Sequence, residues 1–138
     1  NNNQIMEVIK LIKQTSKKKI GILGISFKKD TDDLRNSPIL DVISVLISES
    51  FNVKIYDPDV NFNNLIGING SYFKSKNLSS ENILSDFPTI VEESEVIVVT
   101  KRTEEYEQIL DFLDEKIVID LIRLSGKIVH ENYIGICW

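Results

Sequence analysis

The sequence is poor in the residues that build disulfides and zinc sites. It holds one cysteine, Cys137, in 138 residues, so no disulfide can form within the chain. That usage is typical of a protein of the reducing cytosol, and we expect a cytoplasmic location. The single histidine, His130, and the single cysteine give no zinc-ligand spacing. The sequence therefore predicts a domain that folds without disulfides and without a bound metal.

Long apolar runs and an excess of positive charge are also missing. The chain has no run of about 18 apolar residues, the length that a membrane-spanning helix requires. It carries 16 basic and 21 acidic residues, for a net charge of −5. An acidic chain without a basic stripe is unlike a general nucleic-acid binder. We therefore expect neither a membrane nor a nucleic acid as partner, although a few local positive charges would suffice for a small anionic ligand.

The residues that are present suit one compact domain. Hydrophobic residues make up 42% of the chain and charged residues 27%, as in ordinary globular proteins. A chain of this length can bury a core of its own. It opens without methionine, inside a helical pattern, and we expect it to be a piece of a longer protein.

Apolar runs that read as buried strands alternate with helical patterns along the chain. The strand-like runs are Lys19–Ile25, Asn52–Pro58, Glu95–Lys101 and Lys116–Ile122. The helical patterns are Asn1–Thr15, Ser37–Ser50, Ser85–Ser94 and Arg102–Leu113. This order predicts a single α/β domain, with a doubly wound, mostly parallel sheet flanked by helices in a Rossmann-like three-layer sandwich.

Two segments give weaker patterns. "SYFKSK" (Ser71–Lys76), in a stretch rich in Asn, Gly and Ser, suggests a short edge strand. The end of the chain, from Arg123 onward, reads as a loop and an apolar tail. Within it we predict a packing role for Cys137 and a surface position for His130.

The stretch "GILGISFKKDTDDLRNSP" (Gly21–Pro38) begins like a nucleotide-binding loop but departs from the dinucleotide fingerprint. That fingerprint requires G-x-G-x-x-G with a helix directly behind it. Here Gly21 and Gly24 give G-x-x-G, and the next helical pattern begins only at Ser37. Autonomous NAD binding is therefore not expected of this loop.

The same loop nevertheless carries the chemistry of a phosphate-and-ring ligand. Open α/β sheets bind ligands at the carboxyl ends of their strands, and this loop follows the first strand. Lys28, Lys29 and Arg35 bring positive charge there, and Phe27 offers an aromatic face. Lysine is a point charge and arginine a fork for phosphate. From composition alone, a solvated loop with internal ion pairs is an equally open interpretation.

The stretch closely resembles the start of the C-terminal domain of the UDP-glucose/GDP-mannose dehydrogenase family. There the pattern runs G-x-L-G-x-x-F-K-x-x-T-D-D-x-R-x-S-P, and this sequence fills every fixed place. The resemblance continues through "KIYDPDV", "EVIVVTKRTEEY" and "KIVIDLIR", while residues 61–87 match only in layout. The final "GICW" is similar to the GDP-mannose 6-dehydrogenase branch.

The resemblance implies a function and a domain organisation. Family members oxidise the C6 hydroxyl of a nucleotide sugar with NAD, in support of polysaccharide biosynthesis, and are homodimers or larger. Residues 1–17 would be the end of the central helical region, and residues 18–138 the C-terminal domain that holds the nucleotide of the sugar substrate. The catalytic cysteine and the NAD-binding domain belong to parts of the family that this chain lacks, so we expect the chain alone to be inactive.

The resemblance also implies roles for individual residues. Lys28 would contact the nucleotide sugar, with Phe27 packed beside it, and Arg123 would be a further substrate-binding residue. Arg35 matches a position that reaches NAD held by the other domain. No catalytic residue and no metal ligand are implied within this chain.

Three alternatives remain. The first is the UDP-glucose branch of the same family. The second is a receiver-type signalling domain, which the spacing disfavours because Asp32 and Asp33 lie far from the strand end and Thr100 and Lys101 share one strand. The third is a non-catalytic interaction module that docks through the apolar tail Ile134–Trp138.

Overall fold

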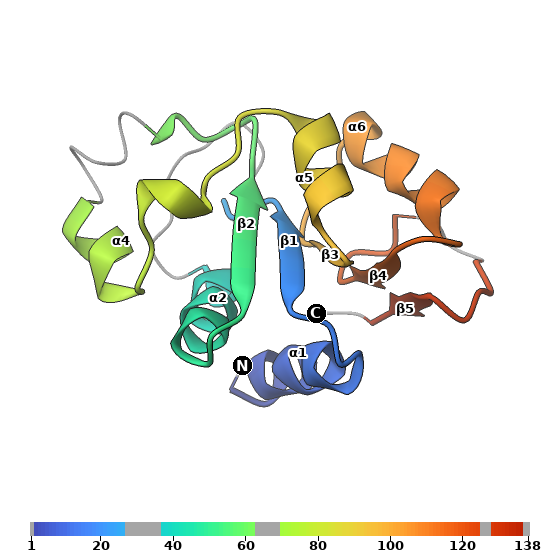
Figure 1. Ribbon diagram of the computed structural model, residues 1–138, viewed down its shortest axis with the longest axis horizontal. Coiled ribbons are helices and arrows are strands. Elements are labelled where there is room, and N and C mark those ends of the chain that lie inside the picture. The colour runs from blue at the N-terminus through green and yellow to red at the C-terminus, as the bar shows by residue number, and fades with distance from the viewer. Residues whose placement is uncertain (1, 27–36, 63–69, 125–127, 137–138) are drawn as a thin grey trace.

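The protein is a five-stranded parallel sheet with helices on both faces, seen in a computed structural model (Figure 1). The structure describes residues 2–26, 37–62, 70–124 and 128–136. The strand order is β2-β1-β3-β4-β5, and every pairing is parallel. The strands are β1 (Lys19–Leu23), β2 (Asn52–Tyr56), β3 (Val96–Val99), β4 (Ile117–Asp120) and β5 (Tyr133–Gly135). This confirms the predicted doubly wound α/β architecture.

The helices form the outer layers. They are α1 (Asn2–Gln14), α2 (Pro38–Ser48), α4 (Gly70–Ser75), α5 (Phe87–Glu93) and α6 (Glu104–Glu107), with short 3₁₀ turns η1 (Ser80–Asn82) and η2 (Gln108–Phe112). Helices α1 and α2 cover one face of the sheet, and α5 and α6 cover the other (Figure 1). In the described part of the chain, no helix is long and apolar enough to cross a membrane.

Strand β3 is buried on both faces of the sheet, with alternate side chains in two different cores. Val96 and Val98 belong to the core beneath α1 and α2, whereas Ile97 and Val99 belong to the core beneath α5 and α6. Successive side chains of a strand point to opposite faces. A strand covered on both sides therefore reads as an unbroken apolar run, which is the pattern that the sequence presents.

Helix α2 begins where the sequence predicts, but without a side-chain capping bond. Ser37 occupies the N-cap position and Pro38 the first helical position. The Ser37 side chain makes no cap bond; its hydroxyl donates to the Ile25 carbonyl at 2.7 Å. The hydroxyl therefore ties the start of α2 to the chain that leaves β1.

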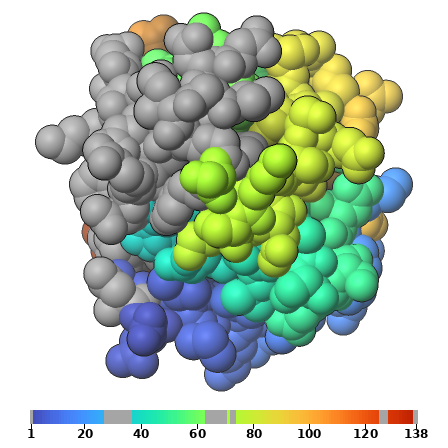
Figure 2. All heavy atoms as spheres, turned by 90° about the vertical axis from the view of Figure 1, so that its left-hand side faces the viewer, coloured from blue at the N-terminus to red at the C-terminus, as the bar shows by residue number. Residues whose placement is uncertain are grey.

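The predicted edge strand at Ser71–Lys76 is wrong, because these residues lie in the helix α4 and the turn that follows it. The outer side of β2 is met instead by a single parallel bridge between Ile55 and Ile83. The turn after α4 is fastened to α2 by Lys76 Nζ, 2.5 Å from Asp41 Oδ1. Figure 2 shows this segment lying directly against α2.

Two further corrections concern the last third of the chain. The helix expected over Arg102–Leu113 divides into α6 and the 3₁₀ turn η2, and Tyr106 and Ile109 are buried in the core. The predicted terminal loop and tail contain a fifth strand, β5, which pairs with β4. A strand of three residues has too few positions for a recognisable alternation.

Candidate functional site

The carboxyl ends of the strands gather the polar chemistry of the domain. Because all the strands are parallel, the segments after β1, β2, β3 and β4 emerge at one edge of the sheet. Ligands of open α/β proteins bind at this edge. Of the six polar residues that are buried among the described ones, five lie in or beside these segments; the five are Ser26, Ser37, Asp57, Lys101 and Asp120.

Asp57, directly after β2, holds the chain that leaves β1. Its Oδ2 accepts the N–H groups of Ile25 at 2.8 Å and Ser26 at 3.0 Å, and the Ser26 hydroxyl at 3.2 Å. The carboxylate is buried, and a buried acceptor is tolerated only when it is hydrogen-bonded. The first residues of the predicted ligand-binding loop are thus fixed to the end of the neighbouring strand.

Lys101, just after β3, joins the same network from the other side. Its Nζ lies 2.7 Å from each of Asp57 Oδ1, Asp59 Oδ2 and Ser26 Oγ. These contacts use all three donors of the ammonium group. The side chains of Lys101 and Asp57 are almost fully excluded from solvent. Lys101 therefore acts as a cross-link between the segments after three strands.

Gly24 and Thr100 set the close approach beneath this network. Gly24 has a φ of +99°, and a Cβ there would stand 2.6 Å from Thr100 Oγ1. The Thr100 hydroxyl donates to the Gly24 carbonyl at 2.5 Å. Only glycine enters this conformation without strain, so the second glycine of the sequence motif serves a tight turn.

Asp120 performs at the end of β4 the task that Asp57 performs at the end of β2. Its Oδ1 accepts the Ile122 N–H at 3.0 Å, and its Oδ2 accepts the Leu124 N–H at 2.7 Å and the Tyr133 hydroxyl at 2.5 Å. Burial, then the hydrogen bond to Asp120, raises the pKa of Tyr133 well above its usual value, against the opposing charges of Arg102 and Arg123. The segment after β4 is thereby fixed in place.

Arg123 is the predicted substrate residue that the structure describes. It lies in the segment after β4, at the carboxyl edge of the sheet, and is exposed. Its φ of 56° places it in the left-handed region, which residues other than glycine seldom adopt. The other predicted contacts, Phe27, Lys28 and Arg35, lie outside the described residues, as does Cys137.

Sequence reasoning missed the residues that support the edge. The sequence placed Asp57, Lys101 and Asp120 within strand-like runs and Arg102 at the start of a helical pattern, without a role at the site. The available signal was an aspartate closing a buried strand in "KIYDP" and "IVIDL", because a carboxylate there can accept N–H groups of the loops at that edge. His130 is partly buried, and its Nε2 lies 3.2 Å from Asp114. In the described residues no group of acidic, histidine or cysteine side chains could hold a metal.

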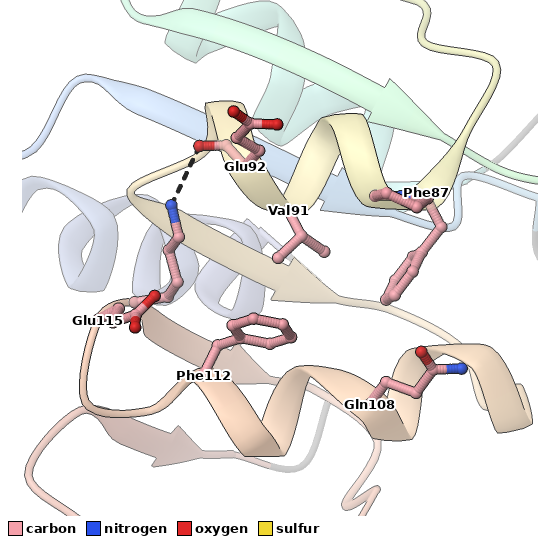
Figure 3. A pocket seen from close by; sticks show the side chains of 8 residues that line it. Phe87, Val91, Glu92, Gln108, Phe112 and Glu115 are labelled. Carbon is pink, nitrogen blue, oxygen red and sulfur yellow. Dashed lines mark hydrogen bonds between the residues drawn. The ribbon is translucent and has the colours of Figure 1, made fainter.

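A separate groove of about 320 Å³ lies between α5 and η2. Phe87, Val91 and Phe112 point toward it (Figure 3). The one cation among its lining residues, Lys116, donates to the Glu92 carbonyl at 3.1 Å and to the Ser94 carbonyl at 2.6 Å. With an apolar floor and acidic side chains at its rim, this groove does not suit a phosphate ligand.

Comparison with known proteins identifies a family of nucleotide-binding domains, in agreement with the polar groups at the carboxyl edge of the sheet. Residues 21–126 match the family model described as "UDP-glucose/GDP-mannose dehydrogenase family, UDP binding domain". GDP-mannose 6-dehydrogenase of Pseudomonas syringae pv. syringae is 32% identical over the whole chain, which covers 32% of that enzyme. UDP-glucose 6-dehydrogenase of Rickettsia typhi is 32% identical over 74% of the chain, which corresponds to 23% of that enzyme.

A solved structure has the same fold. The crystal structure of a ternary complex of GDP-mannose dehydrogenase from Pseudomonas aeruginosa superposes with a TM-score of 0.81, at 31% identity, over all of this chain and 32% of that one. The chain thus spans about a third of the length of the relatives that it matches over its whole extent. It belongs to the UDP-glucose/GDP-mannose dehydrogenase family, and what it matches there is the UDP binding domain.

Proposed function

We propose that this chain binds the nucleoside diphosphate part of a nucleotide sugar, as the C-terminal domain of an NAD-dependent nucleotide-sugar 6-dehydrogenase. The observation that carries the proposal is the alignment of the whole chain with GDP-mannose 6-dehydrogenases. The position of Arg123 at the carboxyl edge of the sheet supports it, since a guanidinium is suited to phosphate oxygens.

The favoured substrate is GDP-mannose, which the enzyme would oxidise to GDP-mannuronate. Six relatives that align with 100% of this chain are GDP-mannose 6-dehydrogenases. The UDP-glucose 6-dehydrogenase of Rickettsia typhi aligns with 74%. A UDP-sugar remains the second candidate, because the matching family model is a UDP binding domain.

The wider proposal covers the cofactor and the setting. The NAD and the catalytic cysteine would be supplied by other domains, and Arg35 would reach that NAD. The enzyme would work as a homodimer or larger assembly in the cytoplasm and would supply uronic acid sugars for polysaccharide biosynthesis. The resemblance of the Gly21–Pro38 motif to the family supports the cofactor, the assembly and the pathway, and the single cysteine supports the cytoplasmic setting.

Calorimetric titration of the 138-residue chain with GDP and with UDP, at low salt, tests the proposal. We expect saturable binding with GDP favoured, and we expect Arg123→Ala to weaken it about tenfold, the effect of one lost charge-assisted contact. Asp114→Asn is a suitable control, because Asp114 lies beside His130, away from the edge segments after β1 to β4. Equal weakening by both variants would contradict a specific role for Arg123, and preference for UDP would favour the second candidate.

A further inference from the structure

The side chain of Arg102 is bonded to the backbone of the segment that carries Arg123. Arg102 follows β3, and its guanidinium donates through Nη1 to the Leu124 carbonyl at 3.0 Å and through Nη2 to the Arg123 carbonyl. A guanidinium presents its donors in a rigid fork. One side chain therefore fixes two successive carbonyl groups on the neighbouring strand's loop.

Asp120 binds the N–H groups of the same segment, whereas Arg102 binds its carbonyl groups. It accepts the N–H groups of Ile122 and Leu124, on either side of Arg123. The carbonyl groups and the N–H groups of this short segment are thus held by two side chains of opposite charge. None of these four bonds involves the Arg123 side chain, which is exposed.

These hydrogen bonds explain how Arg123 can adopt an unfavourable backbone conformation. A residue with a Cβ in the left-handed region is strained, and such strain persists only where the surroundings over-determine it. At Arg123, with φ 56°, the determinants are the bonds from Arg102 and Asp120. Strained residues of this kind concentrate at ligand-binding sites.

The neighbouring acid of Arg102 does not account for the arrangement. Glu107 Oε1 lies 3.6 Å from Arg102 Nη1, and about half of each side chain is exposed. An exposed pair at that distance contributes little. The carbonyl bonds are the shorter contacts, and they connect Arg102 to the ligand-binding edge.

We propose that Arg102 is a positioning residue for nucleotide binding: by holding the Arg123 carbonyl it fixes the left-handed backbone from which the Arg123 guanidinium contacts the phosphates. This inference rests on the proposed function, because it assigns Arg123 to the nucleotide. It adds to that function a residue that itself touches only the protein. Without the hydrogen bonds from Arg102, Arg123 would sample several backbone conformations, and the chain would lose part of its affinity for the ligand.

The test combines a conformational readout with binding. We would prepare Arg102→Met, Arg102→Lys, Arg123→Ala and the double variant R102M/R123A, with Glu107→Gln as the matched control. NMR of the 138-residue chain would follow the Arg123 backbone through its chemical shifts and its HN–Hα coupling. Calorimetry with GDP and with UDP would give the affinities. Arg102→Lys keeps the charge but cannot reproduce the fork, so it separates position from electrostatic field.

We expect Arg102→Met and Arg102→Lys to shift the Arg123 backbone out of the left-handed region and to weaken GDP binding about tenfold. The effect should vanish in the Arg123→Ala background, because a positioning residue has nothing left to position. Glu107→Gln should leave both readouts unchanged.

Two results would overturn the inference, and they are distinguishable. If Arg102→Met leaves the Arg123 backbone unchanged, or weakens binding equally with and without the Arg123 side chain, Arg102 does not act through Arg123. The unaltered chain could bind neither GDP nor UDP while Arg102→Met still shifts the Arg123 backbone out of the left-handed region. The proposed function would then fail for this chain, and the hydrogen bonds from Arg102 would have a structural role alone.

Discussion

Replacing Gly24 by any other residue should destabilise the fold. Its φ is +99°, and an added Cβ would stand 2.6 Å from Thr100 Oγ1 and 2.8 Å from Lys101 Cγ. We predict that Gly24→Ala lowers the free energy of unfolding by about 2–3 kcal/mol, from backbone strain together with the clash. Urea denaturation followed by circular dichroism measures this.

Gly135 provides the matched control for that change. A Cβ at Gly135 would have its nearest neighbour at 3.4 Å, which is ordinary contact. Gly135→Ala should therefore change the unfolding free energy by no more than about 0.5 kcal/mol. Equal losses at both glycines would show that the turn after β1 has no special requirement.

Lys101 supports a second prediction at the scale of the single residue. Lys101→Met leaves the buried Asp57 carboxylate without its counter-ion. Removing one partner of a buried pair typically costs about 3–5 kcal/mol of unfolding free energy. Lys13→Met breaks the pair with Glu49, in which both side chains are more than 40% exposed, and should cost no more than about 1 kcal/mol.

Chemical denaturation of both lysine variants compares the two pairs directly. Adding Asp57→Asn to Lys101→Met should recover part of the loss, because the neutral amide oxygen can still accept the Ile25 and Ser26 N–H groups. A Lys101→Met loss as small as that of Lys13→Met would mean that water solvates the carboxylates in place of the ammonium group.

At the scale of the element, α5 depends on a carboxylate cap. Asp86 Oδ1 accepts the Thr89 N–H at 2.7 Å. Hydrogen bonding to the Thr89 side chain, and then to its backbone, lowers the pKa of Asp86 below its usual value of 3.8. A group whose pKa is lower in the folded state stabilises the fold above its unfolded pKa, and that contribution is lost as the pH falls through the folded value. We predict that Asp86→Ala destabilises the chain at neutral pH and that its difference from the unaltered chain shrinks below pH 3.8.

Thermal unfolding across this pH range tests the cap, and α6 offers the control. Thr103 caps α6 by accepting the Tyr106 N–H at 3.2 Å, without a titrating group. The Thr103→Ala loss, about 1 kcal/mol, should be independent of pH over the same range. A pH-independent Asp86→Ala effect would contradict the assignment of the cap to the carboxylate.

The elements also show what the sequence could and could not predict. Strands β1 to β4 were predictable because burial on both faces leaves an apolar run. Strand β5 was not, since its three residues join the sheet through pairing with β4 that no local pattern encodes. Helix α4 was mistaken for a strand because alternation over a few residues is ambiguous.

The site divides in the same way. The position of Arg123 after β4 was predictable, because it follows a recognisable strand; its contact with the substrate stays a prediction. Its support by Arg102 and Asp120 joins residues from two different strand ends, so it exists only once β3 and β4 lie side by side. The contribution of Lys101 was hidden for the same reason: its three partners are distant in the sequence.

At the scale of the whole molecule, two cores share one sheet. Ile22 of β1 lies in the core beneath α1 and α2, and Ile97 of β3 lies in the core beneath α5 and α6. Both side chains are fully buried, and β1 pairs with β3. Loss of either helical layer would expose one face of the same strands, so the two layers should not unfold separately.

We therefore predict that Ile22→Ala and Ile97→Ala each cost about 2–5 kcal/mol of unfolding free energy and that each variant still unfolds in a single transition. Native-state hydrogen exchange tests this, because a shared sheet requires that either substitution lower protection in both β1 and β3 by a similar amount. If Ile97→Ala lowered protection only in α5 and α6, the layers would open independently. The segments at the carboxyl edge extend from strands that contribute to both cores. Independent opening of the layers would therefore let one core lose its packing while the other still held those strands.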